Sequence, residues 1–332
     1  MAQMKYFYEL TISSSPHVHS PVTTKTIMRD VVIAMIPALL GGIFFFGLRA
    51  LLVTAVSVAA CMFFEWGYCK IAKTDCKVYD LSAVVTGMLL AFVCPVTIPI
   101  WCIIIGDFFA IVVVKQVFGG IGRNIVNPAL AARAFMFSWP ALMTNWVAPG
   151  LQNMVRIPDG VSAATPLAQM SLGQLPEATI AQMFTGNIGG CIGETSAALL
   201  LLGLVYLLIR KIIHLRIPVV FIGTVAVLTF LFPLGNDRIA WMASQVFSGG
   251  LFLGAIFMAT DYVTSPVTKL GQIVYAFGCG VLTVVIRYFG GYPEGVSYAI
   301  LIMNLCVVLL DRIGRPTKFG APNKKKKEVA KG

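Results

Sequence analysis

A threonine in the longest polar stretch of the chain, Thr165, is the residue best placed for covalent chemistry. It ends the small-residue part of segment 159–167 and is followed by Pro166. A Thr before a Pro is typical of a helix N-cap, because Pro at the first helical position needs no hydrogen-bond partner for a backbone N–H. A phosphate ester on the same hydroxyl would lie at the positive end of that helix. Two interpretations stay open: a plain helix cap, and a threonine that carries a phosphate-linked group.

A glycine-rich segment, 118–129, could bring backbone groups close to a ligand. Its glycines allow a compact turn, and Asn127-Pro128 begins a helix whose free N–H groups can receive an anionic or carbonyl-bearing ligand. Asn124 and Asn127 are the candidate cofactor-binding side chains. A packed turn between two helices explains the same pattern equally well.

A second glycine-rich segment, 186–196, precedes an apolar run. Its four glycines let the backbone approach a flat ring, and its last three residues can cap the following helix. A phosphate-binding loop is excluded, since the Gly-Lys-Ser/Thr core is absent. The candidate cofactor contacts in this segment are Asn187, Gly189, Gly190, Glu194 and Thr195.

Three acidic residues are candidates for an ion or proton path. Glu65 and Asp107 lie inside apolar runs, where an unpaired charge costs at least roughly 2.5–3.5 kcal/mol. Glu65 is near the end of its run, so a side chain that reaches out to the membrane surface is the alternative. Asp107 is deeper and is the stronger candidate. Asp261 closes a short apolar run and fits either an ion path or a plain helix-end turn.

The elements that must position these residues are apolar helices. The chain has 332 residues, of which 58% are hydrophobic and 12% charged, with a mean hydropathy of +0.85. Soluble domains contain about 25% charged residues, so the composition indicates an all-α integral membrane protein. Ten apolar runs have the length of helices: 31–47, 50–68, 81–95, 98–115, 127–146, 197–213, 217–233, 248–262, 270–288 and 296–310.

The distribution of basic residues predicts the topology. Lys and Arg gather before the first run, in alternate loops and in the tail, whereas the opposite side has only Arg49, Arg156, Arg238 and Arg287. By the positive-inside rule, both termini are cytoplasmic and the 149–195 loop lies outside the cell membrane. The net charge of +11 is therefore a topology signal. We expect contact with membrane lipid through the basic tail and no nucleic-acid partner. The first 28 residues are too polar for a cleavable signal peptide.

The ten runs divide into two groups of five that resemble each other weakly. Phe-Gly-Gly ends the fourth run of each half, and the third runs, 81–95 and 248–262, are both short and contain glycine. Five is odd, so the repeats would be inverted in the membrane, with a site where the short segments meet. The predicted organisation is a cytoplasmic segment, a five-helix repeat, an outer loop, a second five-helix repeat and a basic cytoplasmic tail, at 1–30, 31–148, 149–195, 196–311 and 312–332.

The eight cysteines do not form a metal-binding pattern. No Cys-x-x-Cys pair occurs, and most cysteines lie inside apolar runs. This spacing argues against a zinc site or an iron–sulfur motif held within this chain. Cys191 falls in the outer loop and has no evident disulfide partner there. We therefore expect no metal ligands from this chain.

Several motifs in a fixed order resemble a known family. They are the segments 10–17, 118–129, 159–167, 186–196 and 259–266. Together they resemble the family that contains the D subunits of Rnf electron-transport complexes and the B subunits of sodium-pumping NADH:quinone oxidoreductases. The resemblance covers nearly the whole chain. The short N-terminal segment is more similar to the Rnf members.

The resemblance implies a covalent flavin. In that family FMN is joined through its phosphate to a Thr in an Asp-x-x-Ser/Thr-Gly-Ala-Thr motif, which aligns here with Asp159, Ser162, Ala164 and Thr165. Ala163 stands where the family usually has Gly. The implied function is that of a subunit of a membrane complex that couples electron flow from reduced ferredoxin to NAD⁺ with Na⁺ or H⁺ export. The implied partners are the other membrane and peripheral iron–sulfur or flavin subunits and a flavin transferase, and there is room for a second, noncovalent flavin such as riboflavin.

Two other functions fit parts of the pattern. Inverted five-plus-five repeats with short third helices also occur in channels and transporters for small polar solutes. A purely structural membrane anchor for redox subunits is the third hypothesis. The segment at Thr165 separates these hypotheses, because neither a channel nor an anchor needs it.

Overall fold

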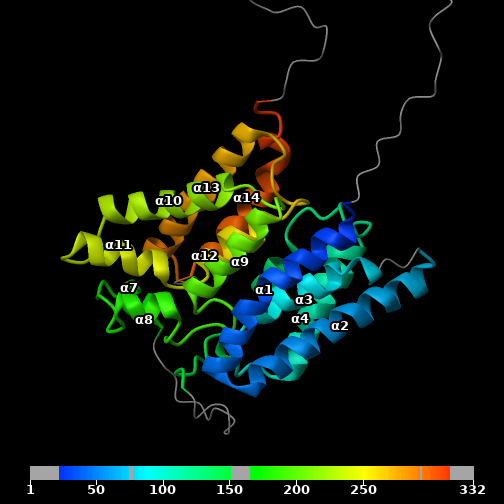
Figure 1. Cartoon of the computed structure of the whole chain (residues 1–332), viewed down its shortest axis with the longest axis horizontal. Helices are drawn as coiled ribbons and strands as arrows, with labels where there is room; N and C mark the ends of the chain where they lie inside the picture. Colours follow the sequence, from blue (N-terminus) through cyan, green and yellow to red (C-terminus); the bar gives the residue numbers. More distant parts are fainter. Residues whose placement is uncertain (1–21, 75–77, 151–164, 292–293, 315–332) are drawn as a thin grey trace, which may run out of the picture.

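The computed structural model describes residues 22–74, 78–150, 165–291 and 294–314 (Figure 1). Within these ranges every regular element is a helix, which confirms the predicted all-helical class. In Figure 1 the helices of the first half, in blue and cyan, lie beside those of the second half, in green to red. The described chain begins and ends on one side, here called the terminal face, while α7 and α8 lie on the opposite side, here called the loop face.

The first half contains two long helices followed by shorter ones. In chain order these are α1 (Thr24–Phe46), α2 (Leu48–Ala72), η1 (Val78–Asp80), α3 (Ser82–Phe92), α4 (Ile100–Phe108), η2 (Phe109–Gln116), α5 (Pro128–Met136) and α6 (Pro140–Met143). The element η2 is a π-helix that continues directly from α4. The predicted fifth run, 127–146, is divided into α5 and α6 by a break before Pro140, because Pro cannot continue a helix hydrogen-bond ladder.

The second half begins with two short helices on the loop face, α7 (Pro166–Ser171) and α8 (Ile180–Thr185). Then follow α9 (Ala197–Ile209), α10 (Arg216–Leu231), α11 (Arg238–Phe247), α12 (Leu251–Leu253), the π-helix η4 (Gly254–Met258), α13 (Lys269–Phe289) and α14 (Val296–Leu310). The sequence patterns predicted the later runs but missed α11. This helix is amphipathic and only 10 residues long, so it has no continuous apolar run.

Apolar helices of two lengths make the described chain a membrane protein. Three of them, α1, α2 and α13, are long and apolar enough to cross a bilayer. The pair formed by α11 and Leu251–Met258 passes the same test together but is bent by 59°. Four shorter apolar helices, α3, α9, α10 and α14, complete the set. The two predicted short segments, α3 and α12–η4, are both present.

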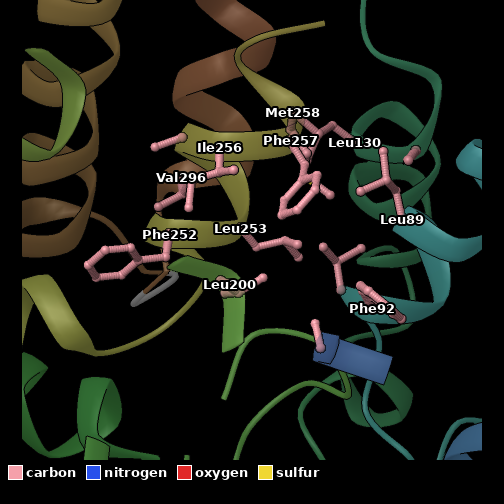
Figure 2. Packing of buried hydrophobic residues seen from close by; sticks show 14 of the residues in the cluster. Leu89, Phe92, Leu130, Leu200, Phe252, Leu253, Ile256, Phe257, Met258 and Val296 are labelled. Carbon is pink, nitrogen blue, oxygen red and sulfur yellow. The ribbon is translucent and has the colours of Figure 1, made fainter. Parts of the chain in front are cut away.

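The two halves meet in one apolar core. Figure 2 shows its centre, where Leu89 and Phe92 of α3 face Leu253 and Phe257 of the bent segment. At the contact between α1 and α9, Gly203 allows a close approach, since a Cβ there would lie 2.4 Å from the backbone oxygen of Ala34. The core therefore joins α3 and α12–η4, the two segments that the sequence singled out as broken.

A loop of the second half is also hydrogen-bonded to the end of α3. The backbone N–H of Ile192 donates to the carbonyl of Cys94 at 3.1 Å, and that of Gly193 donates to the carbonyl of Phe92 at 3.0 Å. These bonds satisfy backbone groups that the early end of α3 would leave unpaired inside the protein. The segment 186–196 thus reaches into the centre of the molecule.

Candidate functional site

Thr165 is the N-cap of α7, as its sequence context predicts. Its backbone is extended, with φ −71° and ψ 150°, and its hydroxyl Oγ1 accepts a hydrogen bond from the N–H of Ala168 at 3.2 Å. The residue as a whole is half-buried. The other predicted flavin-motif residues, Asp159, Ser162 and Ala164, lie outside the described residues.

The helix that follows Thr165 is anchored to the second half. Leu167 and Met170 pack against Trp241 of α11. The indole N–H of Trp241 donates to the hydroxyl of Tyr288 at 2.9 Å, which fixes the ring. Leu167 also fills the space above Gly249, where a Cβ would lie 2.4 Å from its Cδ1. The position of Thr165 is therefore set by packing on the loop-face ends of α11 and α13.

The second glycine-rich segment passes from the surface to the core within a few residues. Asn187 is exposed, Gly190 is half-buried, and Gly189, Glu194 and Thr195 are buried. Ser196 caps α9, because its hydroxyl accepts from the N–H of Leu199 at 3.4 Å. Of the predicted candidates of this segment, Asn187 and Gly190 are therefore accessible from the surface, whereas Gly189, Glu194 and Thr195 are buried.

Glu194 belongs to a charged cluster that joins both halves. Arg133 of α5 donates through Nη1 to Glu194 at 3.0 Å and to the hydroxyl of Ser297 at 2.9 Å, and through Nη2 to Glu294. Only 2% of the Arg133 side chain is exposed, and 3% of that of Glu194. Gly250 provides the space, since a Cβ there would lie 2.5 Å from Oε1 of Glu194. Sequence analysis missed Arg133, although a basic residue within an apolar run is itself a signal.

The same cluster contains three groups with the chemistry of metal ligands. One ligand atom each from Cys191, Glu194 and Glu294 lies within 4.8 Å of the others. The guanidinium of Arg133 contacts all three residues, so it supplies the positive charge that a metal ion would otherwise bring. Buried charges persist when they are paired and hydrogen-bonded. The arrangement therefore favours an ion-pair cluster over a metal centre.

A second buried arginine lies beside the cluster. Arg287 of α13 donates through Nη1 to the carbonyl of Gln245 at 2.5 Å and through Nη2 to the carbonyl of Ser248 at 3.2 Å. Its Nε donates to the carbonyl of Glu294 at 3.2 Å. A cation at the C-terminal end of α11 compensates the free carbonyls and the negative end of the helix dipole. Arg287 thus stabilises the break between α11 and α12.

The first glycine-rich segment lies on the terminal face and starts α5. The side-chain oxygen of Asn127 accepts from the N–H groups of Ala129 at 3.1 Å and Leu130 at 3.4 Å. Its amide nitrogen donates to the carbonyl of Met258 at 3.5 Å, which connects the two halves. The side-chain oxygen of Asn124 is buried and has no partner among the described residues. Asn124 is therefore the side chain in this segment that is free to bind a ligand.

A narrow cavity opens between the halves at this point. It contains about 770 Å³ of space between atoms, its mouth included. The polar residues that line it are Ser82, Thr86, Lys115, Asn124, Asn127, Thr260 and Asp261, and the rest of the wall is largely apolar. An apolar cavity with a few convergent polar groups is typical of a small-molecule site. The structure therefore brings three predicted candidates, Asn124, Asn127 and Asp261, to one cavity.

Asp261 caps a turn in the wall of this cavity. Its carboxylate accepts from the hydroxyl of Thr264 at 3.0 Å and from the N–H of Val263 at 3.5 Å. The residue lies in the connection between η4 and α13, and burial raises the pKa of its carboxyl above the ordinary value. The helix-end turn predicted as one alternative is present, and the same carboxyl faces a cavity.

Asp107 and Glu65 lie along one seam between α2 and the α4–η2 helix. The carboxylate of Asp107 accepts through Oδ1 from Ser57 at 2.7 Å and from the thiol of Cys61 at 3.2 Å. Its Oδ2 is buried and has no hydrogen-bond partner among the described residues. The π-helix η2 starts two residues later, and such bulges are frequent at functional sites.

Glu65 lies about two helical turns after Ser57 on α2 and forms a buried ion pair. Its Oε1 lies 2.7 Å from Nζ of Lys115 and accepts from the amide of Gln116 at 2.7 Å. Glu65 is 2% exposed, so its side chain does not extend to the membrane surface by itself. Lys115, the last residue of the predicted run 98–115, lies near the end of η2 with its side chain 2% exposed.

These features define the class of the protein: an all-helical membrane protein whose broken helices meet at buried ion pairs. Comparison with known families gives the particular group. The model described as "NQR2, RnfD, RnfE family" matches residues 11–320, so the chain belongs to this family.

Close relatives cover almost the whole chain. It is 46% identical over 325 residues to the D subunit of the Na(+)-translocating ferredoxin:NAD(+) oxidoreductase complex of Acetobacterium woodii, a match that covers 97% of this chain and 98% of that relative. It is 43% identical over 323 residues to the D subunit of the proton-translocating ferredoxin:NAD(+) oxidoreductase complex of Clostridium ljungdahlii, over 93% of this chain and 96% of that protein. The D subunit of an ion-translocating oxidoreductase complex of Stutzerimonas stutzeri is 37% identical over 339 residues, or 92% of this chain and 94% of the relative.

Proposed function

We propose that this chain is the D subunit of an ion-translocating ferredoxin:NAD⁺ oxidoreductase of the Rnf type. The observation that carries this function is the identity of 46% with such a subunit over 97% of the chain. The chain then works as one part of an enzyme complex, with the other Rnf subunits as partners. Two of its relatives are named for different ions, Na⁺ and H⁺, so the coupling ion of this chain is left open.

The proposed cofactor is FMN, joined through its phosphate to the hydroxyl of Thr165 by a flavin transferase. The local structure fits this group, because Thr165 is half-buried and its hydroxyl already accepts a hydrogen bond from the backbone N–H of Ala168. When bound, FMN would supply one-electron and two-electron redox chemistry. The flavin ring would lie against the nearby glycine segment, with Asn187, Gly189, Gly190, Glu194 and Thr195 as its neighbours, and Asp159, Ser162 and Ala164 would serve recognition of the acceptor threonine.

A second, noncovalent flavin such as riboflavin is proposed for the cavity on the terminal face. The isoalloxazine ring carries both N–H and carbonyl groups, and side-chain amides can pair with both kinds. The side-chain oxygen of Asn124 is buried without a partner among the described residues, so it can accept a hydrogen bond from a ring N–H. Asn127 also lines the cavity. The apolar remainder of the wall would cover the ring faces.

The proposed topology places the two flavins on opposite sides of the cell membrane. Ten spans in two inverted five-helix repeats, 31–148 and 196–311, would put the termini in the cytoplasm and Thr165 outside. Thr165 begins α7 on the loop face, whereas the cavity is lined by Ile27 and Met28 near the start of α1 on the terminal face, as two flavins on opposite sides of the membrane require. A tethered flavin keeps a high effective concentration next to its redox neighbours.

The ion path is proposed to use Asp107, Glu65 and Asp261. The first two lie on one seam along α2, and each has a carboxylate oxygen without a partner among the described residues. A buried carboxylate inside the membrane with an oxygen free to bind an ion or a proton is a candidate for an ion or proton path. Coupling further requires that reduction of a flavin changes the energy of one of two conformations.

A channel or transporter for a small polar solute is the alternative function, supported by the paired short segments α3 and α12–η4. The deciding test is flavin attachment. We expect the chain, produced with a flavin transferase, to give a fluorescent band on a denaturing gel, and Thr165→Val to abolish the band. Thr179→Val is the matched control, because Thr179 is also a helix N-cap but lies outside the flavin motif.

The result separates three functions. A dark wild-type band would refute the covalent flavin. If the wild-type band is fluorescent but the complex with Thr165→Val stays fully active, the flavin does not carry electrons. That result would favour a structural anchor. Loss of fluorescence and of ferredoxin-dependent NAD⁺ reduction in Thr165→Val, but not in Thr179→Val, supports the redox function.

A further inference from the structure

Lys115 stands between two separate spaces on the terminal face. On one side it lines the narrow cavity between the halves. On the other side its partner Glu65 lines a polar space of about 1150 Å³, mouth included, together with Tyr68, Lys73 and Asp80. We call this second space the vestibule. The ion pair of Lys115 and Glu65 thus forms part of the wall that divides the cavity from the vestibule.

We propose that Lys115 and Glu65 form a proton-transfer connection from the vestibule to a ligand that is reduced in the cavity. This inference rests on the proposed second flavin. It goes beyond it, because it assigns to two residues of this chain the task of delivering the proton that accompanies an electron.

The contacts form one continuous chain of acidic, basic and hydroxyl groups. Nζ of Lys115 lies 2.7 Å from Oε1 of Glu65 and donates to the hydroxyl of Ser82 at 2.6 Å. The hydroxyl of Ser82 donates to Oδ1 of Asp80 at 2.5 Å. Every neighbouring pair is within hydrogen-bond distance, as direct proton transfer requires.

The two ends of the ion pair each have spare capacity. Oε2 of Glu65 is buried and has no hydrogen-bond partner among the described residues, so it can accept a proton that arrives from the vestibule. An ammonium group has three N–H donors, and Glu65 and Ser82 account for two of those of Lys115. The third is left for a ligand in the cavity that Lys115 lines.

The proposed step conserves charge and atoms. Lys115 would donate a proton to a ring nitrogen of a bound flavin, whose added electron and negative charge would come from the electron flow of the complex. The N–H bond of the ammonium breaks, and its electron pair stays on the resulting amine. A proton from the vestibule adds to Glu65, which passes it to the amine. The ring ends neutral, and the Lys115–Glu65 ion pair is restored.

Other charged groups face this pair from each neighbouring element. Asp80 of η1 is connected to the pair because its carboxylate accepts a hydrogen bond from the hydroxyl of Ser82. Lys73, next to the end of α2, lines the vestibule, and Asp261 of the second half lines the cavity. Within the described part of the chain, the acidic group that contacts Nζ directly is Glu65, at 2.7 Å. The direct proton donor to Lys115 is therefore Glu65.

The decisive variant is Lys115→Arg, because an arginine keeps the positive charge and the ion pair but does not lose its proton in proteins. The experiment uses the assembled complex. In one portion the noncovalent flavin is released by acid precipitation and quantified. In a second, intact portion, reduction by ferredoxin is followed by rapid-mixing absorbance. The anionic and the protonated one-electron-reduced rings have different spectra, so protonation is observed separately from electron arrival.

We expect the anionic spectrum to persist about 10²-fold longer in Lys115→Arg, in line with the usual size of general acid catalysis. Glu65→Gln should protonate the ring at the wild-type rate in the first turnover and show the persistent anionic spectrum only in later turnovers, since it blocks reprotonation of Lys115. Lys73→Arg, a lysine of the same vestibule, should behave as the wild type. Bound flavin with an unchanged protonation rate in Lys115→Arg would overturn the relay alone. Absence of noncovalent flavin from the wild-type complex would overturn the second flavin and the relay together.

Discussion

Replacement of Arg133 by Met should destabilise the protein by several kcal/mol. The variant removes the guanidinium that bonds to Glu194 and Glu294 and leaves a buried and a half-buried carboxylate close together. Hydrogen bonds to charged groups contribute about 1.5–3 kcal/mol each, so the two carboxylate contacts together represent about 3–6 kcal/mol. This agrees with the cost of about 3–5 kcal/mol for removing one partner of a buried ion pair.

The assay is reversible unfolding of the purified chain in detergent, followed by tryptophan fluorescence. The triple variant Arg133→Met, Glu194→Gln, Glu294→Gln should recover most of the loss, because no uncompensated charge remains. Arg123→Met, at an exposed arginine, is the matched control and should change the free energy of unfolding by less than about 0.5 kcal/mol. A loss below about 1 kcal/mol in Arg133→Met, or a triple variant no more stable than the single one, would refute this account of the cluster.

Two further predictions concern the helix break and the seam along α2. Gly250→Ala should lower the free energy of unfolding by about 1–3 kcal/mol through overpacking, because its Cβ would lie 2.5 Å from Oε1 of Glu194. Gly223→Ala is the control and should be tolerated, since the space at its Cβ is open. Equal melting temperatures of the two variants would contradict the packing argument. Asp107→Asn should leave the complex assembled but lower redox-driven ion uptake into inverted membrane vesicles at least tenfold, because acidic residues inside the membrane commonly mark ion paths. Normal uptake by this variant would show that Asp107 is not part of the ion path.

Local signals predicted the features that depend on neighbouring residues. The Thr-Pro sequence at 165 gave the N-cap of α7, and Asn127-Pro128 gave the start of α5, because a cap is decided within four residues of the chain. The two short segments were recognised from their length and glycine content. The division of the fifth run at Pro140 had a local signal as well, but the prediction continued through it.

The buried basic residues could not be placed in the same way. Arg287 fitted the alternation of charged loops and Lys115 ended a predicted apolar run, and only their partners reveal that they are buried. Those partners are distant in sequence, for example 50 residues between Glu65 and Lys115 and 61 between Arg133 and Glu194. A basic residue near the end of an apolar run looks the same in sequence whether it faces water or a carboxylate. Its environment is decided by tertiary packing.

The cluster around Arg133 also has a consequence for how the protein is made. Arg133 precedes Glu294 by 161 residues. At roughly 5–20 residues per second, the ribosome needs about ten to thirty seconds to deliver the second carboxylate. During this interval the nascent first half holds a cation whose compensation is incomplete. Insertion of the last two helices therefore completes the charge balance of a segment that entered the bilayer long before, and a chain truncated after α12 should be recognised by membrane quality control as unfinished.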